Sequence, residues 1–491
     1  MNTFMEVLKA ANNYKTTENG GVAYKSTLNK VMDLFAFGGA YRSRSDADCI
    51  LLFKEAFDEN PVLALKCLFY LRDVRGGQGE RRFFRVCYNW LAQKYPNVAR
   101  KNLVHIAEYG RFDDALYACA DTQLEKAVLE LIKAQLAADI QTETPSLLAK
   151  WLPSCNASSA KTRAMGNKVR EYLGATQKEY RKLLSHLRKK INVLEKTMSA
   201  NKWDEIDFSK IPSKAGLKYR NAFATREETK ERYAEFAKSD GTKVNAGTLY
   251  PYEIVYNALR YRFHPIADSQ RRMINKYWEN LPDYFDGKTS NMLCVVDTSG
   301  SMTGGGASAP IDVAISLGIY AAERAGGPFK DHYISFSSRP SLVAVRGIDI
   351  ADKAERIYDN CIIDNTNLTA VFDLLLAIAD RPDTKEEDIP QNIVVISDME
   401  IDYQSNWDET TAITEMEKIR KKWSDHGHKM PKLIYWNVDA RSNTILDKGE
   451  GVSFVSGMSP SIFKHIITGK TGFELFMETV GNNKRYELIQ A

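Results

Sequence analysis

The sequence predicts a protein of two parts, an all-α N-terminal part followed by a doubly wound α/β domain. In the first part, apolar residues recur mainly with helical spacing, whereas in the second, apolar β-rich runs alternate with amphipathic helices. The net charge changes from +13 over residues 1–290 to −9 over residues 291–491. The length of 491 residues also allows more than one domain. We expect a basic helical domain at 1–287 and an acidic α/β domain at 288–491.

The N-terminal part is predicted to be a scaffold of consecutive amphipathic helices. They are expected over residues 46–57, 61–72, 79–94, 101–110, 112–120 and 122–138. Short loops with Gly, Pro or Asn join them, and short connections favour antiparallel helix pairs, as in a HEAT-like array. A further helix is expected from Tyr180 to Met198, with one apolar stripe and a basic opposite face.

The C-terminal part alternates between strands and helices. Strands are expected at 292–297, 332–337, 341–346, 392–398, 432–438 and 452–455. Helices are expected at 309–325, 350–360, 367–380, 410–424, 459–467 and 472–479. This alternation predicts a mostly parallel sheet covered by helices on both faces. Such sheets bind ligands at the carboxyl ends of their strands.

A cluster of oxygen ligands is predicted at that sheet edge. Asp297-Thr298-Ser299-Gly300-Ser301 follows an apolar strand, and alternate residues of an extended chain point the same way. Thr366 precedes a predicted helix, and Asp398 ends another apolar strand. Carboxylate and hydroxyl oxygens are the ligands that Mg²⁺ prefers.

In this order of motifs, residues 290–491 resemble the von Willebrand factor A domain and its metal-ion-dependent adhesion site. The resemblance implies that one Mg²⁺ is held by Asp297, Ser299, Ser301, Thr366 and Asp398. The two serines would bind the ion directly, Thr366 would bind it in the ligand-bound state, and the two aspartates would act directly or through water.

The sequence departs from the family pattern beside the threonine, and this leaves alternatives open. Asp364-Asn365 stand where the family often has Gly-Gly. One alternative is an A domain that has kept the turn and lost the metal. Another is a metal-dependent hydrolase, but two-metal hydrolysis needs several carboxylates, and only Asp364 would add to Asp297 and Asp398. We expect a protein that is not an enzyme.

The helical part contains a glycine-rich loop followed by arginines. Gly76-Gly77-Gln78-Gly79 precedes a helix whose first turns hold Arg81, Arg82 and Arg85. Cations at a helix N-terminus oppose the helix dipole, which is easier to explain if an anion binds there. The loop lacks the Gly-Lys-Ser/Thr of a phosphate-binding loop, so no nucleotide cofactor is expected. The alternative is a solvated turn with arginines paired to Asp73 and Glu80.

A second basic region spans 151–200, with 11 Lys and Arg against 3 Asp and Glu. Nearby aromatic residues, Tyr180 and Trp203, could stack bases while the cations follow phosphates. The candidate RNA contacts of both regions are Arg75, Arg81, Arg82, Arg85, Lys161, Arg163, Lys168, Arg170, Arg181, Lys182, Arg188, Lys189 and Lys190. A solvated basic helix face would have the same pattern.

A basic helical part followed by an A-type domain resembles the TROVE architecture of Ro ribonucleoproteins. Segments 71–81, 148–154 and 203–208 look more like a largely uncharacterised family with the same layout. The Ro resemblance implies a helical ring that binds small noncoding RNAs and single-stranded ends of misfolded RNAs. Our leading hypothesis is a non-catalytic RNA-binding protein. The rival is a protein-interaction module whose metal site captures an acidic residue of a partner.

The remaining sequence features indicate a cytoplasmic protein. No apolar run approaches the ~18 residues of a membrane span. The first residues lack the basic start and apolar core of a signal peptide. The seven cysteines are scattered, which indicates reduced thiols and neither a disulfide framework nor a zinc site.

Overall fold

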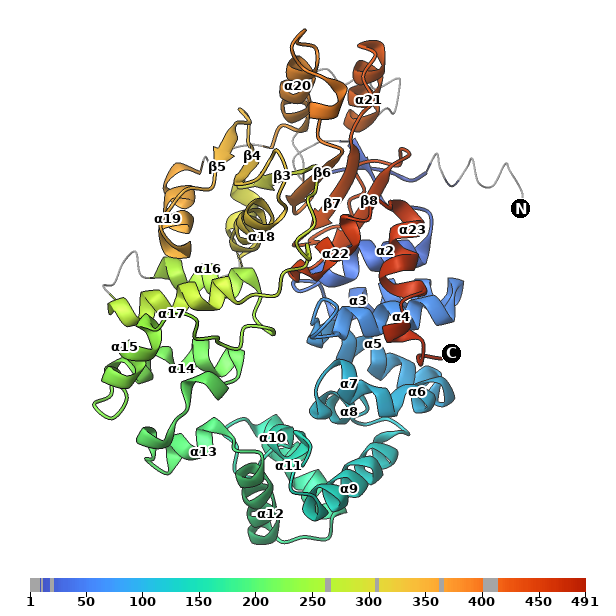
Figure 1. Cartoon of the computed structure of the whole chain (residues 1–491). Helices are drawn as coiled ribbons and strands as arrows, with labels where there is room; N and C mark the ends of the chain where they lie inside the picture. The colour runs from blue at the N-terminus through green and yellow to red at the C-terminus, as the bar shows by residue number, and fades with distance from the viewer. Residues whose placement is uncertain are drawn as a thin grey trace.

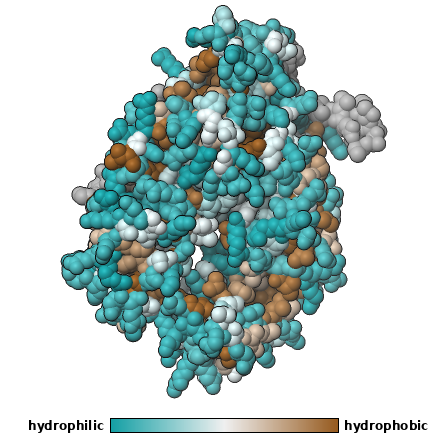
Figure 2. Space-filling view, viewed as in Figure 1, coloured by the Kyte–Doolittle hydropathy of each residue, from teal (hydrophilic) through white to brown (hydrophobic). Residues whose placement is uncertain are grey.

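The protein is a ring of helices joined to a sheet. The computed structural model describes residues 9, 12–17, 22–260, 266–304, 309–361, 366–400 and 414–491. Figure 1 shows the helices following one another around an open centre, with the sheet on one side of the circle. Figure 2 shows that this largely hydrophilic face is hollowed near the centre of the ring. None of the described helices is long and apolar enough to cross a membrane.

The ring consists of consecutive, mostly short helices, so the predicted helical N-terminal part is confirmed. In chain order they are α2 (Lys30–Phe37), α3 (Asp46–Glu59), α4 (Pro61–Arg72), α5 (Arg81–Lys94), α6 (Pro96–Asn102), α7 (Ile106–Tyr109), α8 (Phe112–Ala118), α9 (Glu125–Gln141), α10 (Leu148–Trp151), α11 (Ala160–Tyr172), α12 (Gln177–Lys190), α13 (Leu194–Ser199), α14 (Ser213–Thr225), α15 (Lys230–Lys238), α16 (Pro251–Leu259) and α17 (Asp268–Glu279). Polar caps fix several starts. Ser45 and Asp48 form a capping box at α3, and Asn60 accepts the Leu63 N–H at α4.

Two predicted helices are divided in the structure. The helix expected at 101–110 is replaced by the end of α6, a 3₁₀ turn at Leu103–His105, and α7. The helix expected to reach Met198 ends at Lys190, and α13 follows as a separate helix. Asn192 between them has φ +48°, and a left-handed residue cannot continue a right-handed helix. The prediction of one continuous apolar stripe was therefore wrong.

The C-terminal part contains the predicted, mostly parallel sheet. Its strands are β3 (Met292–Asp297), β4 (His332–Phe336), β5 (Leu342–Ala344), β6 (Asn392–Ser397), β7 (Lys432–Asn437) and β8 (Val452–Ser456). Their order is β5-β4-β3-β6-β7-β8, and only the β4–β5 pair is antiparallel. All residues of β3 and β6 are buried, as expected for central strands covered on both faces.

Helices cover this sheet close to the predicted positions. They are α18 (Pro310–Arg324), α19 (Ile350–Asn360), α20 (Leu368–Ala379), α21 (Glu415–Asp425), α22 (Phe463–Ile466) and α23 (Gly472–Phe476). The apolar runs set the strands, and the 3.6-residue spacing of apolar positions set the helices between them. The central strands β3 and β6 place their carboxyl ends side by side, and the candidate site lies there.

The N-terminal segment packs on the α/β part as well as on the ring. The hairpin of β1 (Tyr14–Thr16) and β2 (Val22–Tyr24) is joined to the chain after β7, because Tyr24 and Ile445 exchange backbone hydrogen bonds of 2.8 and 3.0 Å. Helix α2 packs beside β8, and the Ser456 hydroxyl donates to the Phe35 carbonyl at 2.9 Å. Contacts therefore cross the boundary that was placed between residues 287 and 288.

Candidate functional site

Two aspartates meet at the carboxyl ends of the central strands. Asp297 is the last residue of β3, and Asp398 directly follows β6. The strands are parallel and in register, with Val296 opposite Ile396, so both side chains emerge at one point of the edge. Both residues have 0% exposure. The strand pattern thus brings together the carboxylates of Asp297 and Asp398, which lie 101 positions apart in the sequence.

The serines beside Asp297 turn their oxygens toward this point. The Ser299 N–H donates to Asp297 Oδ1 at 2.9 Å, which folds the turn back on the strand end. The hydroxyl oxygens of Ser299 and Ser301 are 3.0 Å apart, and the Ser301 hydroxyl also hydrogen-bonds Asp398. The Ser397 hydroxyl donates to Asp297 Oδ2 at 2.5 Å. Two carboxylates and two hydroxyls therefore converge.

Burial and charge make this cluster unfavourable for two bare anions. Burial raises the pKa of Asp297, and the charge of Asp398 raises it further. Burial also raises the pKa of Asp398, although the neighbouring Arg441 acts in the opposite direction. A bound cation would relieve this cost, because an opposite charge favours the ionised carboxylates.

Thr366 lies at the same edge, two residues before α20. Its side chain is buried, and its hydroxyl donates to the Glu400 carbonyl at 3.3 Å. Asp364 and Asn365, which depart from the family pattern, lie outside the described residues.

Sequence reasoning missed two residues at this site, Arg441 and Glu400. Arg441 Nη2 lies 2.7 Å from Asp398 Oδ2. Glu400 is buried, its N–H donates to Asp398 Oδ1 at 3.2 Å, and its carboxylate accepts the hydroxyls of Ser442 and Thr444. The Asp-Met-Glu sequence after β6 was the available signal for Glu400, whereas no local pattern indicated Arg441.

The donor set fits one hard divalent cation such as Mg²⁺. Its atoms are carboxylate and hydroxyl oxygens, which such ions prefer over nitrogen or sulfur. Within the described ranges, no group of three or more His, Cys, Asp and Glu side chains is arranged to hold a metal, so an ion here would depend on the hydroxyls. Asp364, which the hydrolase alternative would add as a further carboxylate, lies outside the described residues.

The glycine-rich loop is a buried junction and not a solvated turn. Gln78 has 0% exposure, its Oε1 accepts the Ser459 N–H at 3.1 Å, and its Nε2 donates to the Tyr70 hydroxyl at 2.8 Å. The Tyr250 hydroxyl donates to the Gln78 carbonyl at 3.1 Å. The loop therefore joins α4 and α5 to the start of α16 and to the chain after β8. Its glycines serve this close packing, because a Cβ on Gly77 would lie 1.9 Å from the Tyr70 carbonyl oxygen.

The arginines around this loop mostly pair with carboxylates of the helical part. Arg75 lies 3.7 Å from Glu108, Arg82 pairs with Asp46, and Arg85 contacts Asp113 and Asp114 at 3.0 and 2.7 Å. Arg81 lies beside Arg85 and Arg111, and partial burial lowers its pKa. The alternative expected arginines paired with carboxylates, and Arg75, Arg82 and Arg85 do form such pairs. Their partners are not the expected Glu80 and Asp73.

The predicted RNA contacts on α11 and α12 divide into two groups. Arg163 and Arg188 donate to backbone carbonyls, and Lys168, Arg170 and Lys190 have carboxylate partners. The second group is exposed and forms no ion pair or side-chain hydrogen bond with any described residue. Its members are Lys161, Arg181, Lys182 and Lys189.

The aromatic neighbours of this basic region belong to the core. Tyr180 is 1% exposed, and its hydroxyl donates to the Pro153 carbonyl at 3.0 Å. Trp203 is 5% exposed, and the Arg226 guanidinium lies 4.1 Å from its ring centroid. The expectation that these two rings are available to stack bases was wrong, since helix packing covers them.

The comparisons with known proteins place the chain in a family. The model of a family described as a domain of unknown function, DUF2828, matches residues 17–117 and 123–289. The chain belongs to this family. A second model, described as domain of unknown function DUF7788, matches residues 291–488, so the two DUF models meet close to the start of β3. Neither description mentions a von Willebrand factor A domain.

Two similar proteins are informative for this DUF2828 member. An uncharacterized protein of Acanthamoeba polyphaga mimivirus is 29% identical over 502 residues, which covers 93% of this chain and 85% of the viral protein. The crystal structure of the Deinococcus radiodurans Ro (RSR) protein matches with a TM-score of 0.50 at 14% identity, over 90% of this chain and 100% of that one. The Ro-like architecture implied by the sequence resemblance is therefore confirmed at the level of the fold.

Proposed function

We propose that this protein is a non-catalytic, Ro-like RNA-binding protein whose helical ring contacts RNA. The observation that carries the proposal is a group of four unpaired cations on α11 and α12, all of them predicted RNA contacts. Lys161, Arg181, Lys182 and Lys189 are exposed and form no ion pair with any residue that the structure describes. Unneutralised cations on one pair of helices are what a phosphate backbone contacts. The fold shared with the Ro protein gives further support.

Ion pairs within the protein favour some of the expected RNA contacts over others. Arg75, Arg82 and Arg85 have acidic partners inside the protein, so RNA would have to compete with those carboxylates. The four unpaired cations of α11 and α12 have no carboxylate partner among the described residues with which RNA would compete. We assign the main phosphate contacts to Lys161, Arg181, Lys182 and Lys189.

Salt-dependent RNA binding tests this function. Fluorescence anisotropy should measure the affinity for a single-stranded RNA and for an RNA hairpin between 50 and 200 mM salt. The affinity should fall as salt rises, because each phosphate contact releases roughly one counterion from the RNA. Changing the four unpaired residues to Gln should weaken binding strongly. The matched control changes Lys385, Lys418, Lys421 and Lys464 to Gln, which removes the same charge from exposed α/β positions. Absence of RNA binding at low salt overturns the proposal.

The α/β domain is proposed to be of the von Willebrand factor A type, with one Mg²⁺ held by Asp297, Ser299, Ser301, Thr366 and Asp398. The converging oxygens and the raised pKa values of both aspartates support this assignment. When bound, the ion would supply a positive centre for an acidic side chain of a protein partner. Capture of such a partner is the second candidate function, and the buried oxygen cluster is the observation that favours it.

A further inference from the structure

A cavity lies between the loop after α10 and one face of α12. Its volume is about 270 Å³, and its lining includes Ser154, Cys155 and Asn156 from the loop. Gln177, Arg181 and Arg188 line it from α12, where their spacing of four and seven residues keeps them on one face. Figure 1 shows α10 and α12 on the side of the ring opposite the sheet.

The floor of the cavity is fixed by hydrogen bonds. Arg188 donates through Nε to the Ala149 carbonyl at 2.8 Å and through Nη2 to the Leu152 carbonyl at 3.0 Å. The Tyr180 hydroxyl donates to the Pro153 carbonyl at 3.0 Å. These bonds hold α12 against the turn that ends α10. A cavity with a fixed floor loses little entropy when a ligand binds.

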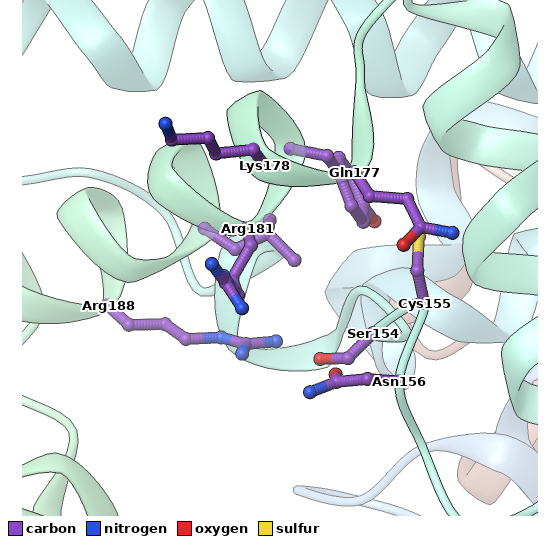
Figure 3. Close-up of a pocket in the computed structure, with 9 residues that line it drawn as sticks. Ser154, Cys155, Asn156, Gln177, Lys178, Arg181 and Arg188 are labelled. Atoms are coloured by element: carbon purple, nitrogen blue, oxygen red, sulfur yellow. The ribbon is translucent and has the colours of Figure 1, made fainter.

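The polar groups around the cavity suit an anion that also carries hydrogen-bonding groups. Its lining holds the cations Lys178, Arg181 and Arg188 and includes no Asp or Glu. Glu179, the nearest acid on the helix, is used in the capping box with Thr176. Figure 3 shows the Arg181 and Arg188 side chains facing the same space as Ser154 and Asn156. Guanidinium groups bind phosphate, and hydroxyl and amide side chains can bond a ribose or a base edge.

We propose that this cavity binds one ribonucleotide of an RNA strand, with its phosphate at Arg181 and Arg188 and its ribose or base toward Ser154, Asn156 and Gln177. This inference rests on the proposed RNA-binding function and gives it a defined subsite. The volume lies near the lower end of ordinary ligand pockets, which suits one nucleotide and excludes a base pair. RNA bound only to exposed lysines would not enter it.

Cys155 allows the subsite to be tested directly. It lines the cavity and is partly buried, and Cys361 in the α/β part is also partly buried. Alkylation of the whole chain by N-ethylmaleimide, followed by mass spectrometry, should show Cys155 protected by a saturating single-stranded RNA and by AMP, with Cys361 unchanged. Inorganic phosphate should protect less than AMP, because it lacks the ribose and base. Equal protection by phosphate would reject the nucleotide assignment.

Substitutions complete the test. Arg181→Gln should abolish the protection of Cys155 and weaken RNA binding by about tenfold, the usual effect of losing a hydrogen bond to a charged group. Lys126→Gln is the control, because it removes an exposed charge on α9 outside the cavity. If RNA binds but Cys155 reacts at the same rate, the subsite is wrong and the RNA-binding function stands. If RNA does not bind, the function fails, and AMP protection alone then decides whether the cavity holds a nucleotide.

Discussion

Arg441 places a guanidinium nitrogen 2.7 Å from Asp398 Oδ2, so a cation of the protein itself already holds one of the two buried aspartates. The segment that carries Arg441 is tied to the N-terminal residues. Lys15 Nζ donates to the Ser442 hydroxyl at 2.8 Å, and the Ala440 N–H donates to the Ala40 carbonyl at 3.1 Å. Arg441 is thus positioned by a part of the chain that packs on both the ring and the sheet.

The first prediction concerns competition between Arg441 and a metal ion. Arg441→Gln should raise the affinity for Mg²⁺ by roughly tenfold or more, because a nearby positive charge no longer opposes the ion. Titration calorimetry of the full chain measures this change. Arg381→Gln, which breaks an exposed ion pair with Asp383, should leave the affinity unchanged. Equal or weaker Mg²⁺ binding in the Arg441 variant would show that the guanidinium does not compete.

The second prediction concerns loss of the metal. At a hundred times its dissociation constant, Mg²⁺ should stabilise the wild-type protein by about 2.7 kcal/mol, because it binds only the folded state. Asp297→Asn should remove this stabilisation. Without Mg²⁺ the variant should be at least as stable as the wild type, since it removes one of two buried, mutually repelling carboxylates. Thermal unfolding with Mg²⁺ and with EDTA gives both results, and an Mg²⁺ shift retained in the variant contradicts the ligand assignment.

The third prediction concerns the ion pair between the ring and the last residues of the chain. Asp73 has 0% exposure and accepts hydrogen bonds from Arg485 Nη2 at 2.8 Å and from the Tyr486 hydroxyl at 3.1 Å. Asp73→Asn should lower the free energy of unfolding by about 3–5 kcal/mol, because it leaves a guanidinium without its buried partner. Asp383→Asn, at an exposed pair, should cost less than about 1 kcal/mol. Urea unfolding of both variants makes the comparison, and equal losses would refute it.

The fourth prediction concerns closure of the ring at Gly79. A Cβ there would lie 2.0 Å from the Tyr250 hydroxyl, and φ is +69°. Gly241 has φ +79°, and a Cβ added there would have no atom within 4 Å, so a Gly241→Ala variant measures the backbone strain without a clash. Gly241→Ala should cost about 1–2 kcal/mol of unfolding free energy, and Gly79→Ala about 1–3 kcal/mol more through the clash.

Tyr250→Phe separates the clash from the strain. It removes the hydroxyl that the new methyl group would meet, so in the Gly79→Ala background it should recover part of the lost stability. Chemical denaturation of the wild type, the two single variants and the double variant gives a double-mutant cycle, which measures the coupling between Gly79→Ala and Tyr250→Phe. Additive losses would mean that the two residues do not press on each other, and that the ring closes by other contacts.

Local patterns predicted much of this fold. Apolar runs such as Met292–Asp297 and Asn392–Ser397 identified the strands, and their parallel pairing brought Asp297 to Asp398. The helix break at Asn192 was not predicted, because the helical spacing of apolar residues continues on both sides of this single left-handed residue. No local pattern predicted the role of Arg441, because tertiary packing brings it to its partner Asp398.

The glycine-rich loop shows the same limit. Its glycines and arginines are what an anion-binding loop would also contain, and the Gln78–Ser459 contact joins residues 381 positions apart. The spacing of apolar residues within a short stretch of sequence carries no information about a contact between such distant residues. It also cannot tell a buried tyrosine from an exposed one on a basic helix, as Tyr180 demonstrates.

The contact between Phe35 and Ser456 also constrains the order in which the chain folds. The two residues are 421 positions apart, and at about 5–20 residues per second a ribosome needs roughly 20–80 s to synthesise the chain between them. Helix α2 can pack on α3 and α4 early, but the part of its surface that contacts β8 stays uncovered until β8 has been synthesised. During that interval the nascent chain is exposed to aggregation, and a chaperone that shields its early helices should increase the yield of native protein.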